Sequence, residues 1–168
     1  MTVGNNPVDR SKLGTKRHIL TDKKGIPLSA VISSASTHDI KLVTDVIDNS
    51  IIKRTFASGM TKKGTRRRKY HYLCLDSAYQ SKSIEQEIIR RGYIPHIPYK
   101  RKRGQMIKNT NQKRYHPYMN KRWVVERTNS WHNRFRKLFT RYEKKVENYL
   151  GLVHLSCSII IYRKIILG

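Results

Sequence analysis

The chain has 168 residues, which suffice for one hydrophobic core, so the sequence predicts a single domain over residues 1–168. Its 36 Lys and Arg residues against 11 Asp and Glu residues give a formal net charge of +25, which favours a polyanionic partner, above all nucleic acid. No apolar or lipidated anchor accompanies this charge, so a membrane partner is disfavoured. Both cysteines lie in apolar runs, which indicates reduced thiols in a cytoplasmic protein.

The first third of the chain predicts a hairpin followed by a helix. Two β-rich runs at residues 16–21 and 28–34 are joined by DKKG, whose Asp and Gly suit a tight turn. Residues 37–51 then begin with Thr37, a possible helix cap, and continue with helical apolar spacing. The expected buried face of this helix comprises Ile40, Val43, Val46 and Ile47.

The middle of the chain predicts a basic loop and then a strand, a helix and a strand. SGMTKKGTRRRK at 58–69 has glycines and no apolar period, whereas YHYLCLDSAY is typical of a buried strand ending at Asp76. A helix over 81–91 is closed by Gly92, and YIPHIPY at 93–99 predicts a short strand.

The last third predicts an exposed basic excursion over 100–118 and then two helical regions, one around Glu126 and a long one over 143–166. The expected buried face of the long helix comprises Val146, Leu150, Val153, Cys157 and Ile161. The order of elements predicts a mixed α/β domain in which a sheet is flanked by helices, with a long C-terminal helix.

Asp76 is a candidate functional residue because of its place at a strand end. It follows an apolar run and precedes the small residues Ser77 and Ala78, and α/β sheets place ligand sites beyond the carboxyl ends of their strands. Capping of the next turn is an equal alternative from this position alone.

Glu126 is the single acid in RWVVERTNSWHNRFRKLF, residues 122–139. At about 100° per residue it falls on the polar side of a helix. The apolar stripe comprises Val124, Thr128, Trp131, Phe135 and Leu138, and the polar side comprises Arg122, Glu126, Asn129 and Asn133. A surface ion pair with Arg122 or Arg127, worth about 0.3–0.5 kcal/mol, is the alternative. Together, however, two carboxylates in so basic a chain suit Mg²⁺ held against a phosphate backbone.

Two basic runs, KKGTRRRK and KRKR, are dense enough to neutralise several DNA phosphates. Their candidate DNA-binding residues are Lys62, Lys63, Arg66, Arg67, Arg68, Lys100, Arg101, Lys102 and Arg103. Solvated loops that keep the protein soluble are the alternative. Trp123 could stack on an unpaired base, although core packing is the more common role for an aromatic residue at helical spacing.

Four segments carry a resemblance to a known family: SKLGTKRHILTDKKGIPLSAVISSASTHD, LCLDSAY, RRGYIPHIP and RWVVERTNSWHNRFRKLFTRYEKKVENYLGLVHLSCSIII. They resemble the DDE-type transposases of bacterial insertion sequences, in the group numbered four and five, over nearly the whole chain. The resemblance implies an RNase H-like fold, two Mg²⁺ or Mn²⁺ ions, and attack by water or a 3′-hydroxyl on DNA phosphodiesters. It makes Asp76 the second acid of the catalytic triad and Glu126 the third.

Arg122 fits an arginine that the family places four residues before the glutamate. Met119 replaces an expected tyrosine, and Asn133, beside Arg134, replaces an expected lysine, and both departures concern the contacts to the DNA ends. Arg122 and Arg134 join the candidate DNA-binding residues. The family's first acid precedes the hairpin on a strand for which this sequence has no counterpart, and Asp9 in NNPVDRSK is a poor substitute.

The chain is therefore expected to be the carboxy-terminal part of a catalytic domain and inactive by itself. Expected partners are transposon-end and target DNA, together with either a second copy of the chain or the product of an upstream frame. DNA cleavage by these residues with Mg²⁺ or Mn²⁺, abolished by Asp76→Ala, would contradict this expectation. The alternatives are a non-catalytic basic DNA-binding remnant of a transposase and, more remotely, an RNA-binding protein. Metal-dependent thermal stabilisation separates an enzyme from a remnant.

Overall fold

The computed structural model describes residues 3–6, 10–52, 58–60, 66–68, 71–98 and 123–167. The chain forms two compact units, of which unit 1 comprises Met1–Ile52 and Trp123–Gly168, and unit 2 comprises Lys53–Arg122. Unit 2 is thus an insertion in the sequence of unit 1.

Unit 1 is built on a three-stranded antiparallel sheet with the order β1-β2-β3. The strands are β1 (Gly4–Asn5), β2 (Leu13–Thr21) and β3 (Pro27–Ser34), and β2 and β3 form the hairpin that the sequence predicts. In the connecting turn, Asp22 Oδ1 accepts hydrogen bonds from the backbone N–H groups of Lys24 (2.8 Å) and Ile26 (2.9 Å). Gly25 adopts φ +83°, a conformation that favours glycine.

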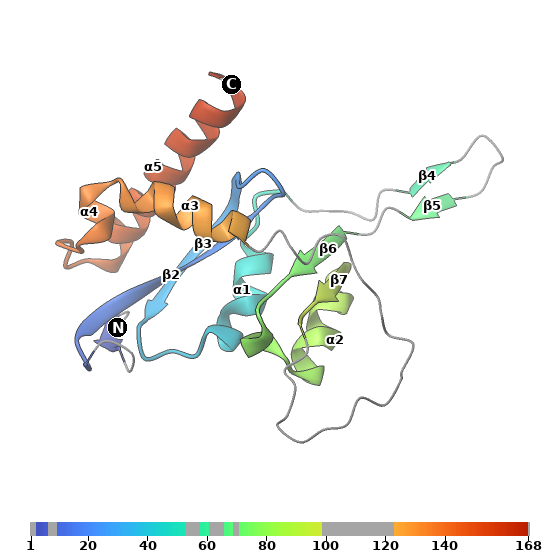
Figure 1. Cartoon of the computed structure of the whole chain (residues 1–168), viewed down its shortest axis with the longest axis horizontal. Coiled ribbons are helices and arrows are strands. Elements are labelled where there is room, and N and C mark those ends of the chain that lie inside the picture. The colour runs from blue at the N-terminus through green and yellow to red at the C-terminus, as the bar shows by residue number, and fades with distance from the viewer. Residues whose placement is uncertain are drawn as a thin grey trace. The chain divides into compact units, whose positions relative to one another are not determined.

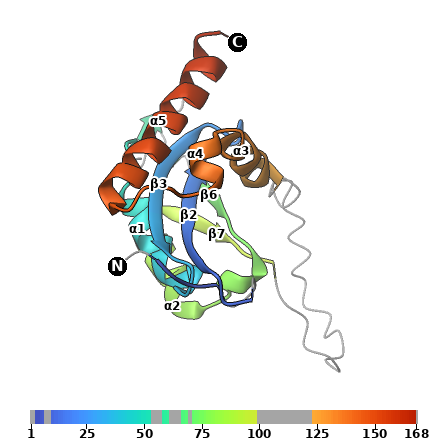
Figure 2. The ribbon, with the colours of Figure 1, turned by 90° about the vertical axis from the view of Figure 1, so that its left-hand side faces the viewer.

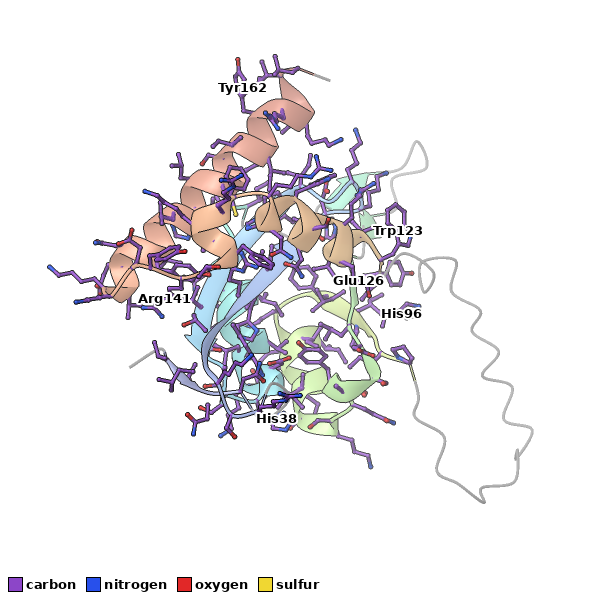
Figure 3. All side chains as sticks on the ribbon, turned by 60° about the vertical axis from the view of Figure 1, so that its left-hand side comes forward. His38, His96, Trp123, Glu126, Arg141 and Tyr162 are labelled. Carbon is purple, nitrogen blue, oxygen red and sulfur yellow. The ribbon has the colours of Figure 1, made fainter. Side chains whose placement is uncertain are left out.

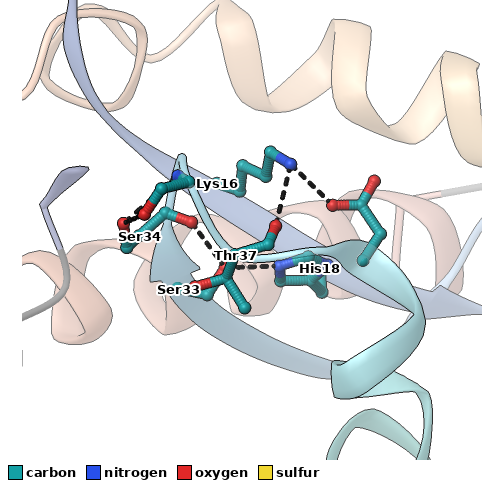
Figure 4. A network of polar contacts seen from close by, with 7 residues as sticks. Lys16, His18, Ser33, Ser34 and Thr37 are labelled. Atoms are coloured by element: carbon teal, nitrogen blue, oxygen red, sulfur yellow. Dashed lines mark hydrogen bonds and ion pairs between the residues drawn. The ribbon is translucent and has the colours of Figure 1, made fainter. Parts of the chain in front are cut away.

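The segment after β3 contains a 3₁₀ turn, η1 (Asp39–Leu42), and then the short helix α1 (Val43–Asp48). Both are shorter than the predicted helix over 37–51, although Val43 and Ile47 are buried as expected. Thr37 does not cap this helix; its carbonyl accepts a hydrogen bond from Lys16 Nζ at 3.0 Å. Lys16 Nζ also pairs with Asp39 Oδ1 at 2.8 Å, so the loop is tied to β2 before the helix begins (Figure 4).

Two helices pack on the hairpin of unit 1, α3 (Trp123–Asn133) against β2 and α5 (Val146–Ile165) against β3, and α4 (Arg136–Phe139) packs against α3 and α5 (Figures 1 and 2). The predicted stripe from Val124 to Leu138 does not lie on one helix. The chain turns at Phe135, whose backbone is extended with φ −83° and ψ 102°. Leu138 is buried nonetheless, because α4 turns it into the core.

One hydrophobic core cluster among the described residues of unit 1 lies between α5, α4 and the sheet. It comprises Leu138, Tyr149, Val153 and Cys157, packed against Ala30, Ile32, Phe135 and Leu152. The buried face of α5 is rotated from the predicted one and comprises Tyr149, Val153, Ser156, Cys157 and Ile160. Val153 and Cys157 belong to both faces, and Tyr149, which was not predicted to be buried, donates its hydroxyl to the Leu138 carbonyl at 3.2 Å. No helix in the described ranges is long and apolar enough to cross a membrane.

Unit 2 contains a parallel pair of strands, β6 (His71–Cys74) and β7 (Tyr93–His96), connected through η2 (Ser77–Tyr79) and α2 (Lys82–Arg90). The predicted strand, helix and strand are therefore confirmed, but β6 is not the buried strand expected, because only Leu73 is buried and Tyr72 and Cys74 are exposed. Gly92 ends α2 as predicted, with φ +83° and its N–H bonded to the Ile89 carbonyl at 2.9 Å. Ile88 is the fully buried residue of α2, and the helix packs against β7.

The basic segment 58–69 was predicted to be a loop, and this prediction is wrong for part of it. β4 (Ser58–Met60) and β5 (Arg66–Arg68) pair antiparallel. Backbone hydrogen bonds hold so short a hairpin, and they require no apolar periodicity in the sequence. The predicted excursion over 100–118 lies outside the described residues. The mixed α/β class is confirmed, with the described strands divided among three small sheets.

Candidate active site

Asp76 lies two residues beyond the end of β6 and is exposed to solvent. Its carboxylate caps η2, because Oδ1 accepts a hydrogen bond from the Ser77 N–H, and its carbonyl accepts one from the Tyr79 N–H at 3.0 Å. The neighbouring Leu75 N–H donates to the His96 carbonyl at 3.0 Å, so Asp76 follows the edge of the sheet where both parallel strands end. The sequence left two interpretations of Asp76 open, a functional position at a strand end and a cap of the next turn. In the structure Asp76 both follows the strand end and caps the turn.

Glu126 projects into solvent from the first turn of α3 (Figure 3). A carboxylate in the first turn is favoured by the helix dipole, which is a structural reason for an acid at this position. Within the described ranges no Lys or Arg forms an ion pair with Glu126. Two partners were expected for Glu126. Arg127 donates instead to the Lys24 carbonyl, and Arg122 lies outside the described residues.

Arg127 and Thr128, which follow Glu126, fasten α3 to the β2–β3 turn. Arg127 Nη2 donates to the Lys24 carbonyl at 2.7 Å, and its guanidinium carbon lies 4.6 Å from the Trp123 ring centroid and 5.0 Å from that of Trp131. The fully buried Thr128 Oγ1 donates to the Gly25 carbonyl at 2.8 Å. The orientation of Glu126 on the surface of unit 1 is set by these contacts. No sequence pattern predicts this contact, because residues 25 and 128 are brought together only by folding.

His132 is a second residue that the sequence did not single out. Its side chain is fully buried on α3, 3.3 Å from Ser156 Oγ through Nδ1 and 3.7 Å from Cys157 Sγ through Nε2. Ser156 Oγ donates to the Val153 carbonyl at 2.7 Å, so it accepts from His132, and the proton therefore sits on Nδ1. Burial, and secondarily the charge of Arg17, lower the pKa of His132 to about 4, and burial raises the pKa of Cys157 to about 11. Both groups are thus neutral at pH 7 and serve packing rather than chemistry.

The candidate DNA-binding residues are described only in part. Lys62, Lys63, Lys100, Arg101, Lys102, Arg103 and Arg122 lie outside the described residues, and Arg66, Arg67 and Arg68 form β5 without described side chains. Arg134 is exposed directly after α3. Beside it, Asn133 Oδ1 accepts a hydrogen bond from Arg17 Nη2 at 2.7 Å. A cation from β2 therefore stands next to the position where the resemblance places a lysine.

The described residues include no group of three or more His, Cys, Asp or Glu side chains arranged to hold a metal ion. Asp76 belongs to unit 2 and Glu126 to unit 1. Each is an exposed carboxylate, and hard oxygen donors of this kind are the ligands that Mg²⁺ and Mn²⁺ prefer. The chemistry of the two donors therefore fits such an ion.

Comparison with known proteins decides the family. A family model described as the transposase DDE domain matches residues 3–161. The chain belongs to the DDE transposase family. A Burkholderia cepacia protein assigned as a transposase for insertion sequence element IS402 is 31% identical over 157 residues, which make up 94% of this chain and 67% of that protein. No solved structure matches the chain.

The membership confirms the resemblance to insertion-sequence transposases that the sequence motifs carry. Both candidate carboxylates of this DDE transposase-family chain, Asp76 and Glu126, lie within the matched residues. So do the basic runs and the α3–α5 region.

Proposed function

We propose that these residues are part of a DNA transposase, an enzyme that cleaves DNA phosphodiesters and transfers strands with the help of divalent metal ions. Membership of the DDE transposase family is the observation that carries this proposal. The net charge of +25 supports a DNA partner, because DNA phosphates compensate cationic side chains. In this proposal residues 1–168 belong to one RNase H-like catalytic domain.

Asp76 and Glu126 are the proposed ligands of Mg²⁺ or Mn²⁺. When bound, such ions activate the attacking oxygen and stabilise the leaving oxygen of a phosphodiester. The rigid attachment of α3 to the β2–β3 turn supports this role for Glu126, because a ligand must be held in one orientation. Arg122, Arg134 and the two basic runs are the proposed phosphate contacts, and their cations position the strand without reading its sequence.

The metal ligands are tested by melting the protein with and without Mg²⁺ or Mn²⁺. At an ion concentration ten times Kd, binding to the folded state stabilises it by about 1.4 kcal/mol. We expect this shift in Tm to be smaller in Asp76→Asn and in Glu126→Gln and to be retained in two control variants, Glu85→Gln on α2 and Glu147→Gln on α5. If both acids bind the same ions, the double variant loses little more than either single variant. A full metal shift in the double variant would refute these ligands.

Catalysis is tested with labelled duplexes that carry transposon ends. Residues 1–168 supply two of the three carboxylates that the resemblance implies, so we propose that they bind such DNA without cleaving it. Cleavage in Mg²⁺ or Mn²⁺ that disappears in Asp76→Asn would show that these residues suffice. Absence of both metal and DNA binding would remove the transposase proposal altogether.

A further inference from the structure

A basic and aromatic segment connects the end of α3 to the start of α5 and comprises residues 134–145. Of its residues, only Arg134 is among the phosphate contacts proposed above. The segment contains six basic residues, Arg134, Arg136, Lys137, Arg141, Lys144 and Lys145, and one acid, Glu143. Five of the six basic side chains are exposed, the exception being the partly buried Arg141. Phe139 and Tyr142 lie among them, with exposed fractions of 72% and 75%.

The exposure of these two aromatic residues does not come from a detached loop. Arg141 fastens the segment, since its Nη1 donates to Thr15 Oγ1 on β2 at 2.6 Å and its Nε to the Glu143 carbonyl at 2.9 Å. Its guanidinium carbon lies 5.1 Å from the ring centroid of Tyr149 in the core. Leu138 is buried beside Phe139, and its carbonyl accepts from the Tyr149 hydroxyl.

The fold therefore holds the segment in place and leaves Phe139 and Tyr142 outside the core. Both are large aromatic side chains left in water, and both lie between basic residues of the same segment. Bases stack on aromatic rings while Lys and Arg neutralise the phosphates, and this combination is how proteins bind strands with unpaired bases. We propose that residues 134–145 bind a nucleic-acid strand with unpaired bases, which stack on Phe139 and Tyr142.

Other occupants suit the segment less well. A second copy of the same surface would bring like charges together, which is unfavourable. An anionic membrane requires an amphipathic helix with a broad apolar face, and α4 has only 4 residues. The inference rests on the proposed function for its choice of DNA as the partner, and it adds a binding surface and a preference for unpaired bases.

The test measures DNA binding by fluorescence anisotropy. The probes are a labelled single strand of oligo-dT, about 20 nucleotides long, and a labelled duplex of equal length. Both are longer than the usual site size of a surface that binds single-stranded DNA. We expect Phe139→Ala and Tyr142→Ala each to weaken binding of the single strand about 5- to 160-fold, which corresponds to about 1–3 kcal/mol for one stacked base. Binding of the duplex should change less than about twofold. Tyr142→Phe should retain affinity, because it keeps the ring.

Tyr162→Ala is the matched control for the aromatic residues, since Tyr162 is also exposed, with a fraction of 55%, but lies near the other end of α5. For the cations, the double variant Lys144→Gln/Lys145→Gln should weaken binding of both DNA forms and flatten the dependence of log Kd on log salt by about 1 to 2. Lys41→Gln/Lys82→Gln removes the same charge from exposed positions elsewhere and should have a smaller effect.

Three results would overturn the inference. The first is that Phe139→Ala and Tyr142→Ala bind the single strand with the same affinity as Tyr162→Ala. The second is that these two variants lose as much affinity for the duplex as for the single strand. The third is that the protein binds phosphatidylserine vesicles and that the two variants abolish this binding while DNA binding persists. The metal-dependent shift in Tm is measured separately. If that shift is intact and the aromatic variants bind normally, the inference fails alone. If the aromatic variants lose the single strand and no metal shift exists, the proposed metal ligands fail alone.

Discussion

At the scale of single residues, His132 makes stability depend on pH. Its pKa of about 4 in the folded chain lies below the ordinary value of 6.5, so between these values the unfolded chain binds a proton that the folded chain does not. Stability therefore falls as the pH decreases from about 6.5 to about 4, by roughly 3 kcal/mol at 1.36 kcal/mol per pKa unit. The half-buried His18, whose pKa is also lowered by burial, acts in the same direction.

Urea denaturation at several pH values measures this dependence. We expect His132→Gln to have a flatter profile between pH 6.5 and 4, because glutamine does not titrate, whereas His154→Gln, at an exposed position on α5, should keep the profile of the unmodified protein. An identical pH profile for both variants would show that His132 is not the group responsible.

At the scale of elements, the contact between α3 and the β2–β3 turn is expected to stabilise unit 1. Thr128→Val removes the hydroxyl and leaves the Gly25 carbonyl without that donor, which costs about 1–3 kcal/mol. Gly25→Ala adds a Cβ that would lie 3.0 Å from Thr128 Oγ1, at a residue with φ +83°, so it should also destabilise. Equilibrium denaturation measures both. Thr44→Val on α1, at a position that is only partly buried, is the control and should change stability by less than about 0.5 kcal/mol.

Helix α2 offers an internal comparison in unit 2. Ile88 is fully buried and Ile89 is 58% exposed, although they are adjacent and identical in type. Ile88→Ala should cost about 2–5 kcal/mol, because it leaves a cavity, and Ile89→Ala should change stability by less than about 0.5 kcal/mol. Thermal or urea denaturation followed by circular dichroism distinguishes the two. Equal effects would mean that α2 does not pack against β7 through Ile88.

At the scale of the whole molecule, the charge of +25 should make stability depend on salt. Like charges repel in the folded chain, and screening strengthens as the Debye length falls from about 30 Å at 0.01 M to about 8 Å at 0.15 M. We expect Tm to rise over this range of NaCl and to rise further with a polyanion such as heparin. Affinity for duplex DNA should fall over the same range, because counterion release then favours binding less. A Tm that falls with added NaCl would contradict the dominance of repulsion.

Much of the local structure follows from the sequence, because each element is determined by neighbouring residues. DKKG predicts the β2–β3 turn, and Gly92 predicts the end of α2. The apolar runs predict the strands β6 and β7, and their parallel pairing comes from the structure. The motifs around Asp76 and Glu126 also predict the transposase family, which the comparisons confirm. Their roles as metal ligands stay a prediction, because the two acids belong to different units.

The sequence by itself determined the family, the mixed α/β class, most of the elements and the exposure of Glu126, since periodicity and turn chemistry act over a few residues. Only the tertiary structure decided the turn at Phe135, the burial of His132, the attachment of α3 to Gly25 and the outward position of Phe139 and Tyr142. These features depend on packing between residues more than 20 positions apart, such as Arg141 with Thr15 and His132 with Ser156. Helical periodicity predicts one face of a helix but does not say which distant side chain that face will meet.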